Sequence, residues 1–149
     1  MRLGWLIILF SLVLMQEVLG QSTKHVNVKK NIAVEGYDVV SYFQGKPIKG
    51  DGKIRANYQS VYYQFSNQEN LQLFIKNPSR YLPEYGGWCA YAMGSSGEKV
   101  EVDPLTYKIV KGKLHLFYNA FFNNTLTDWN KDEVNLKAKA DQNWIKLIQ

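Results

Sequence analysis

Cys89 is the only cysteine in the 149-residue chain, so no disulfide can form within it. Small domains without such a cross-link must be stabilised by apolar burial. Aromatic residues make up 14% of the sequence, and each large ring buries much apolar surface. The sequence therefore predicts a fold that depends on an aromatic-rich core.

The first 20 residues have the pattern of a secretory signal. Arg2 precedes an apolar run at residues 3–15, and Gly20 is a small residue suited to cleavage before Gln21. A run of about 13 residues is shorter than the roughly 20 that a membrane-spanning helix needs. We expect cleavage, no stable membrane span afterwards and a periplasmic or secreted protein; a retained N-terminal anchor is the alternative.

After that signal, the sequence predicts a flexible lead at residues 21–30 and one domain at residues 31–149. The net charge is +5, but acidic and basic residues are interspersed and no segment resembles a nucleic-acid-binding arm. The tyrosine-rich segments also lack the interleaved basic residues of a base-stacking platform. We therefore expect no nucleic-acid partner.

Residues 54–65 have the alternation of a β-hairpin, with a turn at Gln59-Ser60. Ser66 and Glu69 match a capping box, which predicts a helix from Asn67 that ends at Pro78. Upstream, residues 31–43 favour a short extended segment followed by a helical turn. That turn would begin at Asp38, acting as its N-cap.

The second half of the chain predicts another hairpin, around Lys111-Gly112. We expect residues 119–128 to be helical and Asn130 with Glu133 to cap a C-terminal helix. The apolar stripe of that helix is Leu136, Ala140, Trp144 and Leu147. The predicted fold class is α+β, with two β-hairpins packed with a capped central helix and a helical C-terminal segment.

Six segments of the chain form a recognisable set: Gly36-Tyr37-Asp38, Tyr42-Phe43, Tyr63-Gln64-Phe65-Ser66, Asn77-Pro78-x-x-Tyr81, Tyr85-Gly86-Gly87-Trp88-Cys89-Ala90-Tyr91-Ala92 and Asp103-Pro104. Together they resemble the YHS domain, in its longer exported branch. The resemblance covers roughly residues 32–148 and implies an α+β fold of the YHS type; short forms of the family occur beside heavy-metal transport ATPase and oxygenase modules. The most specific marker is the segment from Gly86 to Ala92.

The chain departs from the metal-linked members of that family. Those members usually have a cysteine near the start of the domain, and often a second one after the hairpin. Here the corresponding positions are the stretch from Glu35 to Val40 and Ser66-Asn67, which contain no cysteine. A tetrahedral sulfur site of the usual kind is therefore absent.

Cys89, Met93 and His115 are the candidate metal ligands. If residues 89–93 are helical, the thiol and thioether lie on one face and suit a soft ion such as copper. His115 should lie on the strand face opposite Leu114 and Leu116, where it could complete the site. The alternative is that all three are ordinary core residues. His25, in the expected lead, carries little weight.

A second hypothesis is a binding site for a small molecule or protein partner around the glycine pair, with Cys89 structural. Glycine pairs permit unusual backbone angles, and aromatic walls with a few polar groups are typical of ligand pockets. An aromatic core with satisfied hydroxyls would have the same composition. The candidate residues are Tyr37, Asp38, Tyr85, Gly86, Gly87, Trp88 and Tyr91.

A third hypothesis is a thiol enzyme, in which His115 would activate Cys89 and Asp103 or Asp38 would orient the histidine. No catalytic signature surrounds these residues, so the sequence favours a binding role over an enzyme and leaves the thiol enzyme as the third alternative. Asn123-Asn124-Thr125 matches the N-glycosylation pattern, which matters only in a host that glycosylates exported proteins.

Overall fold

The first hairpin forms a four-stranded mixed sheet with the N-terminal segment. The computed structural model describes residues 23–149, so the predicted signal at 1–20 lies outside the described residues. Strands β3 (Asp51–Tyr58) and β4 (Val61–Phe65) are antiparallel, as predicted. Strand β2 (Ile32–Ala33) pairs with β4 in parallel and with β1 (Val28–Lys29) in antiparallel, giving the order β1-β2-β4-β3.

Residues 23–30, expected to be a flexible lead, are regular structure instead. They form the 3-10 helix η1 (Thr23–His25) and the strand β1. The backbone N–H of Asn27 donates to Gly86 O at 2.8 Å, and the Trp88 indole donates to His25 O at 2.8 Å. These partners lie about 60 residues away in the sequence, so local composition gave no sign of them.

Helix α2 (Gln68–Lys76) covers the sheet through Phe74, whose ring centroid lies 5.0 Å from that of Tyr63 and 5.1 Å from that of Phe65. The predicted Ser66–Glu69 capping box is wrong. Asn67 caps the helix by accepting from Asn70 N at 2.8 Å. The helix ends before Pro78 as predicted, and Pro78 opens a further turn, α3 (Pro78–Tyr81).

The second predicted hairpin is present as β5 (Asp103–Val110) and β6 (Lys113–Phe117). Its strand β6 lies between two cores. Leu114 and Leu116 pack in the core of the first sheet, and Phe117 packs on the opposite face with Trp129. The alternation predicted for this strand is therefore confirmed.

Helices build the second core. Helix α6 (Glu133–Ile148) buries Leu136 and Ala140 and packs Trp144 and Leu147 against the same core, as the predicted stripe requires. Helix α4 (Ala90–Ser95) lies against α6 at Gly94, where a Cβ would come within 2.5 Å of Leu136 O. The predicted Asn130–Glu133 cap is wrong, because the N-cap is Asp132.

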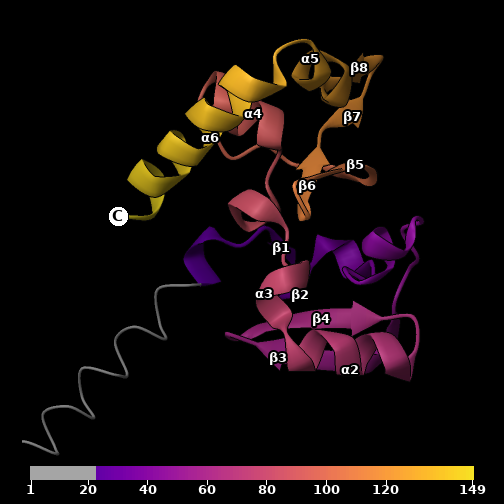
Figure 1. Ribbon diagram of the computed structural model, residues 1–149. Helices are drawn as coiled ribbons and strands as arrows, with labels where there is room; N and C mark the ends of the chain where they lie inside the picture. The colour runs from indigo at the N-terminus through magenta and orange to yellow at the C-terminus, as the bar shows by residue number, and fades with distance from the viewer. Residues whose placement is uncertain (1–22) are drawn as a thin grey trace, which may run out of the picture.

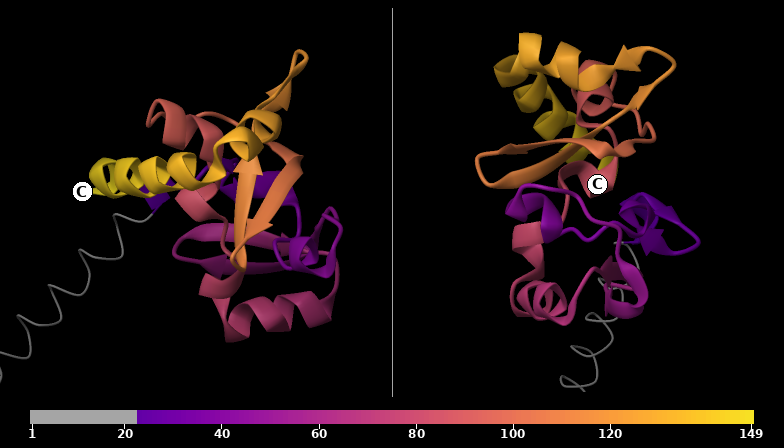
Figure 2. Two further views of the ribbon diagram at one scale, coloured as in Figure 1. Left: turned by 45° about the horizontal axis from the view of Figure 1, so that its top comes forward. Right: turned by 90° about the vertical axis from the view of Figure 1, so that its right-hand side faces the viewer.

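The segment expected to be helical at 119–128 begins as a hairpin. Strands β7 (Asn119–Ala120) and β8 (Asn123–Asn124) precede helix α5 (Thr125–Lys131). Figure 1 shows the first sheet with α2 and α3 in one half of the molecule and β5–β8 with α4, α5 and α6 in the other. Figure 2 shows the β7–β8 hairpin projecting from the body. The predicted α+β class is confirmed: a four-stranded mixed sheet, two further hairpins and a long C-terminal helix.

Candidate functional site

The glycine pair lies in the 3-10 turn η4 (Glu84–Gly87), which has an unusual backbone. Tyr85, Gly86 and Gly87 have φ values of 56°, 62° and 83°. A positive φ is unfavourable for tyrosine and persists only where surrounding contacts hold it. A Cβ on Gly86 would come within 2.3 Å of His25 O. The prediction that this pair serves unusual angles and close approach is confirmed.

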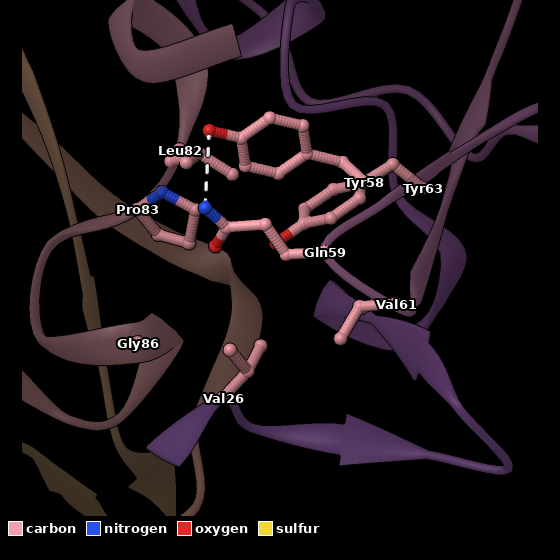
Figure 3. A pocket seen from close by; sticks show the side chains of 8 residues that line it. All are labelled: Val26, Tyr58, Gln59, Val61, Tyr63, Leu82, Pro83 and Gly86. Atoms are coloured by element: carbon pink, nitrogen blue, oxygen red, sulfur yellow. Dashed lines mark hydrogen bonds between the residues drawn. The ribbon is translucent and has the colours of Figure 1, made fainter. Parts of the chain in front are cut away.

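Beside Gly86 lies a cavity of about 180 Å³ between the first hairpin and the segment that follows α3. Figure 3 shows the side chains of both segments around this space. Apolar and aromatic groups form most of its wall. The lining residues are Val26, Tyr58, Gln59, Val61, Tyr63, Leu82, Pro83 and Gly86.

Two kinds of polar group face the cavity: tyrosine hydroxyls and the Gln59 amide. The Gln59 Nε2–H donates to the Tyr58 hydroxyl at 3.5 Å (Figure 3). Burial raises the pKa of Tyr63 above the ordinary value for tyrosine, so its hydroxyl stays protonated and able to donate. The cavity therefore offers a few hydrogen-bonding atoms in an apolar surrounding.

The aromatic residues predicted to line one pocket are dispersed. Tyr85 is buried, and its hydroxyl donates to Asp141 at 2.8 Å. Burial is the main cause that raises its pKa. Trp88 is bound to His25 O, and Tyr91 packs against the second core. Tyr37 lies under the Lys49 ammonium, which is 4.8 Å from its ring centroid.

Asp38 is a fully buried carboxylate that connects its own turn to the start of α2. Its Oδ1 accepts from the backbone N–H groups of Val40 and Ser41 at 2.9 and 3.3 Å. Its Oδ2 accepts from Ser66 N and Oγ at 2.8 and 2.7 Å and from Asn70 Nδ2 at 2.7 Å. The predicted N-cap role of Asp38 is wrong, because the N-cap of the 3-10 turn η3 (Ser41–Gln44) is Val40. These bonds connect residues 38–41 to the start of α2, which indicates a structural role for Asp38.

Cys89 has no exposed surface and precedes α4 as its N-cap residue. The Tyr118 backbone N–H donates to its sulfur at 3.3 Å, and Thr125 Oγ1 lies 3.5 Å from the sulfur. Because the Thr125 hydroxyl donates to Tyr118 O at 2.8 Å, the thiol must donate to Thr125. The sulfur is thus enclosed and hydrogen-bonded on both sides.

Met93 and His115 are also fully buried. The His115 ring lies 5.7 Å from both the Tyr85 and Trp129 rings, and its Nδ1 donates to Lys113 O at 3.0 Å. Its Nε2 is buried without a hydrogen-bond partner among residues 23–149. Burial lowers the pKa of this imidazole, so the neutral form is favoured.

The polar contacts of the Cys89 sulfur are to Tyr118 and Thr125, not to Met93 or His115. Within residues 23–149, no three His, Cys, Asp or Glu side chains gather closely enough to hold a metal ion. This geometry lends the predicted copper site no support. Copper uptake by the reduced thiol stays a prediction.

The remaining predicted features have no common location. Asp103 bonds to Leu105 N and Thr106, and His25 packs edge-on against Trp144. Asn123, of the glycosylation pattern, is exposed on the β7–β8 hairpin. No helix of residues 23–149 has the length and apolar character to span a bilayer.

Most of the cavity wall was missed at the sequence level. The turn at Gln59 was predicted, but nothing local indicates that this hairpin meets Leu82 and Pro83. The usable signal was the glycine pair itself, which marked one edge of the cavity at Gly86.

Comparisons of the chain with models of known protein families, with curated protein sequences and with solved structures found no match. The functional argument therefore depends on the geometry of the chain itself.

Proposed function

We propose that this chain is an exported, non-enzymatic binding module that holds a small, mostly apolar molecule in the cavity beside Gly86. The observation that carries the proposal is the cavity of about 180 Å³, with an apolar wall that includes two tyrosine rings and one amide. Ligand sites are typically concave and apolar, with a few polar groups that fix orientation. The proposal keeps the glycine-pair hypothesis and assigns Cys89 a structural role.

The size and lining of the cavity define the class of ligand. Drug-sized ligands occupy sites of about 300–1,000 Å³, so a smaller cavity favours a molecule of one ring. Val26, Val61 and Leu82 offer aliphatic contacts. A single hydroxyl or carbonyl on the ligand would meet Gln59 or Tyr63, because burying that group without a partner would be unfavourable.

The cavity wall is held in place before any ligand binds. Tyr63 stacks on Phe74, Val61 is part of the first core, and Gly86 O accepts from Asn27 N at 2.8 Å. Such fixed walls reduce the entropy lost on binding. The strained Tyr85 backbone next to Gly86 is also typical of functional sites.

We also propose that the chain is related to the exported branch of the YHS family. The residues that support this relation are the sequence markers, above all Gly86 to Ala92. The absence of the paired thiols of the metal-linked members, together with the enclosed Cys89 sulfur, favours an organic ligand over a metal ion.

The experiment uses p-cresol as the probe, because it combines one ring with one hydroxyl. Thermal unfolding of the protein is followed as p-cresol is added. A ligand at ten times its Kd stabilises the folded state by about 1.4 kcal/mol, which raises the midpoint by several degrees. Val26→Phe should abolish this rise in the midpoint, because the new phenylalanine ring would occupy the space that the ring of p-cresol needs.

The matched control is Val134→Phe, the same substitution at an exposed position of α6 outside the cavity. It should keep the full response to p-cresol. An equal response of both variants, or no response of the wild type at saturating probe, would contradict the proposal.

A further inference from the structure

The tip of the β7–β8 hairpin carries two phenylalanines that are almost fully exposed within residues 23–149. Phe121 is 91% exposed and Phe122 113% exposed. The strands pair Asn119 with Asn124 and Ala120 with Asn123 directly up to the tip, so only the two phenylalanines form the loop. Figure 2 shows this hairpin standing away from the rest of the molecule.

The backbone of this tip is unfavourable for phenylalanine. Phe121 and Phe122 have φ values of 52° and 63°, and a two-residue turn with both φ positive strongly prefers Asn-Gly or similar pairs. Bulky residues are outliers in this region. The tip thus combines backbone strain with full exposure of two rings, and neither is offset by a contact within residues 23–149.

Three other hairpins of residues 23–149 provide an internal comparison. Each has a two-residue loop with both φ values positive. Their tips carry polar residues or glycine: Lys30-Asn31, Gln59-Ser60 and Lys111-Gly112. The same turn is therefore made elsewhere in this chain from residues that suit it, and the phenylalanine pair is not required by the turn.

We propose that Phe121 and Phe122 insert into the surface of a lipid bilayer and anchor the folded domain there. Amphipathic interfacial anchors bind through buried apolar area together with attraction of basic protein to anionic lipid. The two rings supply the first contribution, and the net charge of +5 supplies the second.

The charge distribution around the tip fits this partner. No Asp, Glu, Lys or Arg occurs between Lys113 and Asp128, so the hairpin can enter an apolar layer without desolvating such a charge. Strand pairing up to the tip satisfies the inward-facing backbone groups of Asn119–Ala120 and Asn123–Asn124, which lowers the cost of approaching the bilayer. The asparagines beside the tip can stay at the level of the lipid headgroups.

The area of the tip argues against a stable protein interface. Two phenylalanine rings bury about 300–500 Å², whereas each partner of a specific protein complex buries about 800 Å². A narrow projecting tip would also need a matching pocket in a protein partner. A bilayer needs no matching shape.

The test measures co-sedimentation with vesicles of phosphatidylcholine and phosphatidylglycerol. The exported protein is made in bacterial cells that attach no glycan to Asn123. The double variant Phe121→Asn, Phe122→Gly should have a vesicle partition coefficient at least about tenfold lower than that of the wild type. Its thermal midpoint should rise, because Asn-Gly suits the turn; loss of binding therefore cannot reflect unfolding.

The matched control is Ser60→Gly, which places a glycine on the β3–β4 tip, leaves the cavity-lining Gln59 in place and should partition as the wild type does. A second readout is a fluorophore on Asn123→Cys or on Ser60→Cys, with quenching by nitroxide-labelled lipid. Quenching should be strong at position 123 and weak at position 60.

All of these variants share residues 1–22, so any contribution of that segment to vesicle binding is the same in each. The proposal is overturned if the wild type does not bind these vesicles, which is the result expected of a tip that docks on a protein. Equal partitioning of the wild type and the Asn-Gly variant at the β7–β8 tip, or equal quenching at both positions, would also overturn it.

Discussion

Replacing Asp38 with asparagine should destabilise the protein by about 3–5 kcal/mol, because this buried carboxylate accepts five hydrogen bonds. Asparagine has the same shape but one acceptor oxygen and one donor nitrogen. If the nitrogen takes the place of Oδ1, it faces the N–H groups of Val40 and Ser41. If it takes the place of Oδ2, it faces the donors of Ser66 and Asn70.

The magnitude follows from the fewest bonds that can be lost. At least two donors lose a charged acceptor, and hydrogen bonds to charged groups contribute about 1.5–3 kcal/mol each. Partial rearrangement reduces the sum, which leaves about 3–5 kcal/mol. Since Asp38 connects the segment before β3 to the start of α2, the loss should affect global unfolding.

Urea unfolding followed by tryptophan fluorescence measures this change. With a denaturant slope of about 1–3 kcal/mol/M, the midpoint should fall by more than about 1 M. Asp51→Asn is the control, since Asp51 is exposed and its Oδ1 accepts from Lys53 N at 2.8 Å. A loss below about 1 kcal/mol for Asp38→Asn would refute the structural role of this carboxylate.

Three further predictions concern Cys89, His115 and Gly86. The Cys89 thiol should react with a thiol reagent at least about a hundredfold more slowly in the native protein than in the unfolded chain; rapid native labelling, or Cu(I) uptake that Cys89→Ser abolishes, would favour the metal hypothesis. His115 has a lowered pKa in the folded state because of burial, so the unfolded chain binds its proton first. The neutral imidazole therefore contributes its full stability when the pH is above the ordinary pKa of 6.5. As the pH drops below 6.5, the free energy of unfolding decreases by up to about 1.4 kcal/mol per pH unit. Unfolding curves between pH 7 and roughly pH 5 should show this loss in the wild type and not in His115→Phe; the same acid dependence in both proteins would assign it to other groups. Gly86→Ala should destabilise the fold by about 2–3 kcal/mol, because its φ is +62° and the new Cβ would meet His25 O. Gly45 also has a positive φ but lies in open space, so Gly45→Ala should cost less stability when both variants are compared by thermal unfolding. Equal losses of stability in the two variants would show that the contact with His25 O is not the cause.

Local patterns predicted the elements that depend on short-range chemistry. The turn at Gln59-Ser60, the turn at Lys111-Gly112 and the stripe of α6 were recognisable because alternation and helical period directly reflect burial. The opposite faces of β6 followed from the same rule. These features needed no knowledge of distant partners.

Features with distant partners were predicted poorly. Ser66 does not cap α2: its hydroxyl donates to Asp38, 28 residues away in sequence, and Asn67 caps the helix instead. Residues 23–30 are ordered because His25 and Asn27 bond to the glycine-pair segment. The hairpin at 119–124 was hidden because its tip has two phenylalanines where a turn normally has asparagine and glycine.

The candidate site was predicted in the same uneven way. The glycine pair identified Gly86, one edge of the cavity. The opposite wall comes from the hairpin at Tyr58 to Tyr63, whose contact with Pro83 depends on the tertiary fold. Exposure of Cys89 was equally unpredictable from sequence, because a lone cysteine serves as a ligand or as a core residue with the same local pattern.

The cavity beside Gly86 is the central claim, and methyl NMR with p-cresol tests it most directly. Signals of Val26 and Val61, which line the cavity, should shift together and saturate with one binding constant. The Val134 methyl groups on the exposed face of α6 should not move. Shifts at Val134 alone, or no saturable shift at Val26 and Val61, would contradict the claim.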